Sequence, residues 1–180
     1  MRRTASQTIG PFFRHALVRH ADETIAGPRV EGESIRVEGK VTDADGVAVA
    51  DAILEIFQAD AQGRHPSADN AVGKNAGFSG FGRAATDEAG NFCFTTIHPG
   101  AGSEAPHLDI MVFARGLLKP LLTRIYFAGD PGNAADAVLQ RVPAARQHTL
   151  LARREAASTP ACWRFDVRLQ GEGETVFFDF

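Results

Sequence analysis

The sequence predicts an all-β protein, a β-sandwich with an extended N-terminal arm and one short helix. Apolar and polar residues alternate in several short segments, which is the pattern of half-buried strands. Combinations of Gly, Pro, Asp and Asn that favour turns separate these segments. Hardly any stretch has the 3.6-residue periodicity of a helix. Short strands joined by turns, with little helix, are typical of an antiparallel sandwich.

The elements follow one another in a simple order. Residues 1–33 show little periodicity and are interpreted as the arm, whereas residues 34–180 are interpreted as a single sandwich domain. The first strand is expected at residues 34–42, and a second strand, covered on both faces, is expected at residues 47–59. The remaining strands are expected at residues 91–97, 107–114, 121–127, 149–153, 161–169 and 174–178.

Two segments depart from the strand pattern. Residues 62–82 contain five glycines and predict a long irregular loop, a feature that is usually functional or interfacial in a compact domain. Residues 133–141 predict the one helix, because Pro131 precedes them and Pro143 follows them.

Composition narrows the class of protein. The chain has 180 residues, 44% hydrophobic and 23% charged, with a formal net charge of −3 and both signs interleaved, so we expect no nucleic-acid partner. No apolar run approaches the roughly 20 residues that span a bilayer, and no apolar segment follows the N-terminal arginines as in a secretory signal. Cys93 and Cys162 lack metal-binding or redox spacing. We therefore expect free thiols and a cytoplasmic location without membrane partners.

The order of several motifs resembles the intradiol ring-cleavage dioxygenases. The resemblance is carried by VEGKVTDADGVAVADAILEIFQADAQGR, GFGRAATDEAGNFCFTTIHPG, APHLDIMVFARG and TRIYFAGDP, with SQTIGP near the start and RFDVRLQGEGETVFFDF at the end. It covers almost the whole chain, from residue 6 to residue 180. It implies a β-sandwich of the intradiol dioxygenase type, in which two homologous subunit types assemble into a hetero-oligomer.

The resemblance also implies a cofactor, Fe(III), held by two tyrosinates and two histidines. Hard phenolate oxygens stabilise the ferric state. In this sequence the two histidine positions read His107 and Asp109, the first tyrosine position is His65, and the segment of the second tyrosine reads GAGSEA. Tyr126 is the one tyrosine of the chain and matches a structural position of the family. We therefore expect no metal in this chain, and Fe(III) held by a homologous beta subunit.

Two other functions are considered. His107, Asp109 and a distal His148 imitate the facial triad of an Fe(II)/2-oxoglutarate oxygenase, with Arg153 or Arg154 as the cosubstrate ligand. A simpler interpretation than a metal site is preferred: hydrogen bonds hold the His107 ring, and Asp109 pairs with a nearby donor. The second alternative is a non-enzymatic β-sandwich binding or carrier protein.

By match to the family, four residues are expected to bind substrate: Thr8, Gly10, Pro11 and Arg115. The implied substrates are the aromatic acid protocatechuate and O2. Gly and Pro allow backbone to approach a flat ring, Thr can donate a hydrogen bond, and Arg suits a carboxylate. The alternatives are an ordinary interface arm and, for Arg115, a salt bridge between subunits. Arg83 and Arg124 are expected to form structural ion pairs, and no catalytic residue is assigned to this chain.

Overall fold

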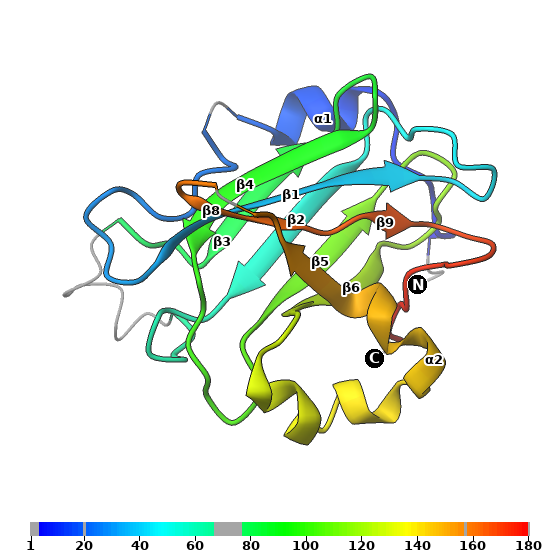
Figure 1. The fold of residues 1–180 in the computed structure, drawn as a ribbon. Helices are drawn as coiled ribbons and strands as arrows, with labels where there is room; N and C mark the ends of the chain where they lie inside the picture. The colour runs from blue at the N-terminus through cyan, green and yellow to red at the C-terminus, as the bar shows by residue number, and fades with distance from the viewer. Residues whose placement is uncertain (1–3, 20, 67–76, 157, 180) are drawn as a thin grey trace.

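The computed structural model describes residues 4–19, 21–66, 77–156 and 158–179. Its strands form one curled sheet in the order β3-β2-β5-β6-β7-β8-β1-β4, with β9 paired to β1 (Figure 1). The strands are β1 (Ser34–Thr42), β2 (Ile53–Gln58), β3 (Phe81–Ala85), β4 (Asn91–Ile97), β5 (His107–Phe113), β6 (Leu121–Phe127), β7 (Leu151–Arg154), β8 (Ala161–Arg164) and β9 (Val167–Arg168).

The curl of the sheet creates the core. Residues alternate between buried and more exposed along β1 and β5, so each strand turns one face inward. Val37 and Phe94 from β1 and β4 belong to the same buried cluster as Leu54 and Ile110 from β2 and β5. The two ends of the sheet therefore share one hydrophobic core, and the outer faces remain available for polar groups.

The predicted strands at residues 34–42, 91–97 and 121–127 are confirmed with their bounds. Two strand predictions are wrong in part. Residues 47–52 precede β2 without forming part of a strand ladder: Ala48 makes one isolated bridge to Thr42, and a turn follows in which Asp51 has a positive φ of 63°. Residues 174–178 form no strand, and only Phe178 bridges to Leu122.

The predicted helix at residues 133–141 is wrong. The structure has two 3-10 helices there, η1 (Pro131–Ala135) and η2 (Leu139–Arg141), because Asp136 has an extended backbone between them and caps the second one through its carboxylate. Two more short helices follow, α2 (Ala144–Gln147) and η3 (His148–Leu150).

The predicted loop at residues 62–82 ends in the unpredicted start of β3. Its residues 67–76 lie outside the described part of the chain. One glycine of this segment has a clear structural reason: a Cβ at Gly82 would lie 2.4 Å from the Ile25 side chain. The close packing of the N-terminal segment on β3 therefore requires glycine there.

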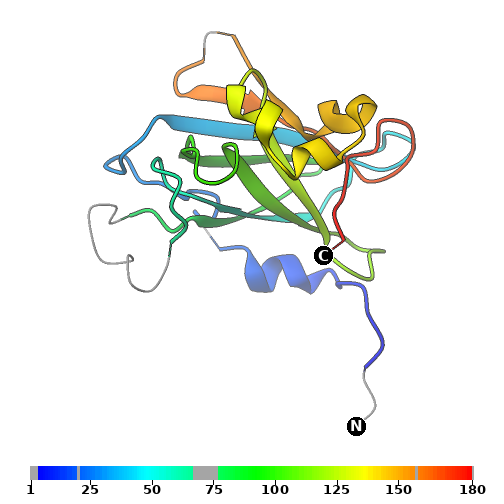
Figure 2. The ribbon, with the colours of Figure 1, turned by 90° about the horizontal axis from the view of Figure 1, so that it is seen from below.

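The N-terminal segment contains an unpredicted helix, α1 (Phe12–Leu17), which lies against one side of the sheet (Figure 2). The Phe13 and Phe113 rings have their centroids 5.8 Å apart, and Arg83 Nη1 donates to the Leu17 carbonyl oxygen at 2.8 Å. The chain before α1 extends away from the body, whereas Ile25 is buried in the core. No helix in the described residues is long and apolar enough to cross a membrane.

Candidate functional site

His107 begins β5, and its ring is fixed by the backbone. Its Nδ1 donates to the Ala105 carbonyl oxygen at 2.7 Å, since a carbonyl oxygen can only accept. Its other ring nitrogen, Nε2, lies 3.6 Å from the Glu104 carboxylate and 3.7 Å from the Asp109 carboxylate. The prediction that hydrogen bonds hold this ring is confirmed.

The neighbouring strand supplies a cation to the same place. In the β5–β6 ladder Asp109 pairs with Arg124 and His107 pairs with Tyr126, so these side chains share one face. Arg124 Nε lies 2.9 Å from Asp109 Oδ1, and Arg124 Nη1 lies 3.2 Å from Glu104 Oε2. Burial opposes the charge of Arg124, but Tyr126 and the two carboxylates outweigh it and raise the guanidinium pKa. The structural ion pairs expected for Arg124 and Arg83, the latter with Glu55, are confirmed.

Tyr126 cannot serve as a phenolate here. The side chain is fully buried, its hydroxyl donates to Asp136 Oδ1 at 2.9 Å, and it accepts a bond from Arg124 at 3.2 Å. Burial raises the pKa of the Tyr126 hydroxyl, so the phenol remains neutral at physiological pH. The hydroxyl instead connects Arg124 to the buried carboxylate of Asp136.

Three of the four positions that the resemblance matches to iron ligands line one pocket. A pocket of about 60 Å³ is lined by His65, by Gly102 to Ala105, and by His107. These residues do not fit the ferric site that the resemblance implies, because the set contains no phenolate and Arg124 already contacts both carboxylates. Among the described residues no group of three His, Cys, Asp or Glu side chains could hold a metal ion.

The facial triad of an Fe(II) oxygenase is not assembled either. Asp109 is engaged by Arg124, and His148 is exposed at the start of η3. These residues and His107 are all described, and they form no metal-binding group.

The four predicted substrate residues lie at the opposite end of β5. Gly116 N donates to Thr8 Oγ1 at 2.7 Å, and Phe13 N donates to the Gly10 carbonyl oxygen at 3.1 Å. Pro11 is the N-cap residue of α1, and Phe13 in that helix packs on Phe113. The segment from Thr8 to Pro11 therefore lies next to the end of β5. We call Thr8, Gly10, Pro11, Asp51, Arg115 and Gly116 the Arg115 corner.

Arg115 is paired within the chain. Its Nε lies 2.9 Å from Asp51 Oδ2, while 60% of the side-chain surface remains exposed. No pattern in the sequence singles out Asp51. The β2–β5 ladder explains why the two residues meet. Ile53 pairs with Phe113, and continuing the chain by two residues beyond each of them reaches Asp51 and Arg115.

The Arg115 corner and the His107 pocket are far apart. Six residue steps of β5 separate His107 from Phe113, which is roughly 20 Å at about 3.3 Å per residue. The predicted substrate residues therefore do not line the pocket that holds this chain's own counterparts of the iron ligands.

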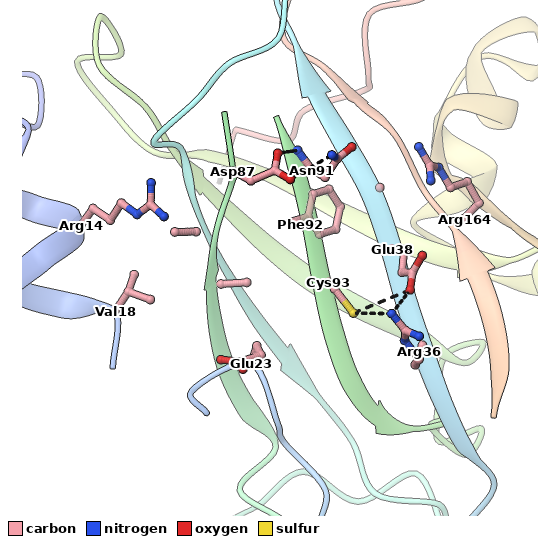
Figure 3. A pocket seen from close by; sticks show the side chains of 13 residues that line it. Arg14, Val18, Glu23, Arg36, Glu38, Asp87, Asn91, Phe92, Cys93 and Arg164 are labelled. Atoms are coloured by element: carbon pink, nitrogen blue, oxygen red, sulfur yellow. Dashed lines mark hydrogen bonds and ion pairs between the residues drawn. The ribbon is translucent and has the colours of Figure 1, made fainter. Parts of the chain in front are cut away.

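A surface hollow of about 650 Å³ lies elsewhere, on the outer side of β1 and β4 (Figure 3). Within it Arg36 contacts Glu38, and Arg36 Nη2 also lies 3.6 Å from the Cys93 sulfur. Arg14 and Arg164 lie on opposite sides of this hollow (Figure 3). No catalytic arrangement is formed there by the described residues.

Comparison with known proteins agrees with this geometry. A family profile described as Dioxygenase matches residues 9–106. The dioxygenase domain of a dioxygenase and carbohydrate-binding protein fusion from Streptomyces sp. SirexAA-E is similar in structure, with a TM-score of 0.67 and 25% identity over 83% of this chain and 87% of that one. 3-Chlorocatechol 1,2-dioxygenase from Rhodococcus opacus 1CP shares the fold, with a TM-score of 0.65 and 23% identity over 81% and 62%. The chain belongs to the intradiol ring-cleavage dioxygenase family.

Within this family the chain resembles one subunit type. The protocatechuate 3,4-dioxygenase alpha chain of Burkholderia cepacia is 43% identical over 99% of this chain and 98% of its own length, and that of Pseudomonas putida is 41% identical over 98% and 96%. The beta chain from B. cepacia is 30% identical over 94% of this chain and 77% of its own length. The chain thus groups with the alpha chains, and the beta chain is a more distant homologue.

Proposed function

We propose that the chain is the alpha subunit of a protocatechuate 3,4-dioxygenase. In complex with a homologous beta subunit it would convert protocatechuate and O2 to 3-carboxy-cis,cis-muconate, with both oxygen atoms entering the product. The observation that carries this proposal is the identity to two alpha chains over almost the full length of both partners. The family sandwich of residues 34–180, preceded by the arm of residues 1–33, is the architecture that we propose for this subunit.

The proposal assigns the iron to the beta subunit. The ferric centre of the family needs a pair of tyrosinates, and the chain has one tyrosine, whose hydroxyl is engaged by Asp136 and Arg124. We therefore derive no chemical step from metal bound to this chain. Its residues would bind and orient the substrate and keep the assembly intact.

The proposal also gives the Arg115 corner a role in trans. Because the corner lies roughly 20 Å along β5 from His107, we infer that Thr8, Gly10, Pro11 and Arg115 line the substrate pocket of the partner beta subunit. Exposed Gly and Pro backbone would contact the flat ring, and the guanidinium would attract the carboxylate of the substrate.

Co-expression with a homologous beta chain tests the proposal. The expected result is a stable hetero-oligomer that contains iron and takes up O2 when protocatechuate is added, while the chain purified alone is colourless and inactive. A lone chain that holds Fe(III) and cleaves catechols would overturn the proposal. A complex without O2 uptake would instead favour a binding protein.

A further inference from the structure

We infer that Asp51 is a positioning residue that aims Arg115 at the carboxylate of an anionic catechol. The inference rests on the proposed function, because the substrate contact belongs to the assembled enzyme. It extends that function by naming a residue for which neither the sequence pattern nor the resemblance supplied a role. Asp51 would set substrate class without touching the reacting ring.

The first argument is the way in which Asp51 holds the guanidinium. The carboxylate contacts Nε of Arg115 at 2.9 Å. Asp51 is the one acidic partner of Arg115 among the described residues, and most of the Arg115 side chain is exposed, so its outer end remains accessible. That end is suited to bidentate recognition of a carboxylate. An arginine that is 60% exposed would otherwise sample many rotamers, and binding would have to order it.

The second argument is the backbone under Asp51. Its φ is 63°, a conformation that is uncommon for residues with a side chain but better tolerated by Asp and Asn. Glycine would adopt this φ without strain. A carboxylate at a position whose backbone glycine would adopt more easily points to a role for the side chain.

The third argument is that this turn is held rigidly. Thr86 is fully buried, and its hydroxyl accepts a bond from Ala52 N at 2.9 Å and donates to the Val49 carbonyl oxygen at 2.8 Å. Both sides of the Asp51 turn are therefore tied to one buried group. A carboxylate on a rigid support can fix the direction of a flexible guanidinium.

The fourth argument is the arrangement of the facing turn. Leu117 N donates to the Ala114 carbonyl oxygen at 3.2 Å, and Gly116 has a φ of 92°, which this tight turn requires. Gly116 N is bound by Thr8 Oγ1. Arg115 thus lies between a turn tied to the arm and a turn that carries Asp51, and all three groups converge at the Arg115 corner.

The test uses the assembled enzyme with Asp51→Asn and Asp51→Gly in this chain. Asparagine keeps the tolerance for positive φ but removes the charge, and glycine removes the side chain while relaxing the backbone. Both variants should raise KM for protocatechuate about 3- to 10-fold and leave kcat within about 2-fold, because the lost interaction orders Arg115 and does not act on the ring. Asp45→Asn, which removes an exposed carboxylate from a neighbouring turn, is the matched control and should leave KM unchanged.

Two further measurements separate positioning from a general structural role. With catechol, which lacks the carboxylate, Asp51→Asn should leave KM and kcat as in the parent enzyme. In an Arg115→Ala background, Asp51→Asn should have no additional effect on KM for protocatechuate. An unchanged or lower KM for protocatechuate in the single variants, or an equal loss with catechol, would overturn the inference. An assembly of unaltered chains that does not consume protocatechuate would overturn the proposed function, and this inference with it.

Discussion

Arg124 Nε lies 2.9 Å from Asp109 Oδ1, across two directly paired positions of β5 and β6. By the resemblance, Asp109 occupies the position of the second histidine ligand. The same guanidinium reaches Glu104 and the hydroxyl of Tyr126. The Arg124 side chain therefore offsets part of the negative charge of these two carboxylates.

Replacing Arg124 with Met should destabilise the isolated chain by about 2–3 kcal/mol. Removal of one partner of a buried ion pair typically costs about 3–5 kcal/mol, but Asp109 and Glu104 keep substantial contact with water, which lowers the cost. Urea unfolding measures the change through the midpoint at constant slope.

Arg154→Met is the control for Arg124→Met. Arg154 lies 3.5 Å from Glu33, and both side chains are mostly exposed, so its loss should change stability by less than about 0.5 kcal/mol. The double variant Arg124→Met with Asp109→Leu should recover part of the lost stability, because it leaves one fewer uncompensated carboxylate. Equal effects of Arg124→Met and Arg154→Met would contradict the compensating role.

Much of the sheet could be predicted from the sequence because its strands have one buried face. Residues 34–42 alternate strictly, and the structure gives the same bounds for β1. The roles of His107 and Asp109 as hydrogen-bonded and ion-paired groups were also predictable. Asp109 finds its partner Arg124 simply because β5 and β6 pair side by side.

The features that were missed depend on contacts between distant segments. β3 begins inside a glycine-rich stretch, and Gly82 is needed because Ile25 packs against it. The helix expected at residues 133–141 is interrupted because the carboxylate of Asp136 binds backbone N–H groups, including that of Ala105, 31 positions away in sequence. Asp51 was missed for the same reason, since its partner is brought near only by the β2–β5 register.

Asp136→Asn should destabilise the chain by about 2 kcal/mol near pH 7. The Asp136 carboxylate is buried and accepts bonds from Tyr126 OH, Ala105 N and Leu139 N at 2.8–3.0 Å. Burial alone would raise the pKa of Asp136, but these hydrogen bonds outweigh it and the pKa is lowered.

The pH dependence of Asp136→Asn follows from the lowered pKa. A depressed folded-state pKa contributes stability that is present above the unfolded value, about 3.9, and is lost as pH falls through the folded value. The stability difference from the parent chain should be constant from about pH 7 to pH 5 and shrink below about pH 4. Urea unfolding across this range measures it, with the exposed Asp45→Asn as the baseline. A difference that grows on acidification would contradict this assignment.

Thr8→Val should weaken substrate binding in the assembled enzyme without weakening the fold. The substitution removes the acceptor of the Gly116 N–H bond in the Arg115 corner, so KM for protocatechuate should rise about 3- to 10-fold. Because Thr8 is exposed, the unfolding free energy of the isolated chain should change by less than about 0.5 kcal/mol. Steady-state O2 uptake and urea unfolding measure the two effects.

The control for Thr8→Val is Thr4→Val, an equal change at an exposed position earlier in the same segment. It should leave both quantities unchanged. If Thr4→Val and Thr8→Val raise KM equally, the effect belongs to the segment as a whole and the specific role of Thr8 is refuted.

The two free thiols should differ strongly in reactivity in the isolated chain. Cys162 is buried, and burial raises the pKa of its thiol to about 11, so little thiolate exists at pH 8. Cys93 is partly exposed on the outer face of β4. Iodoacetamide at pH 8 followed by mass spectrometry of peptides should show Cys93 modified at least about tenfold faster than Cys162. In urea both should react at similar rates, and a Cys93→Ser variant should remove the fast phase; a fast phase that persists in that variant would show that Cys162 is accessible in the folded chain.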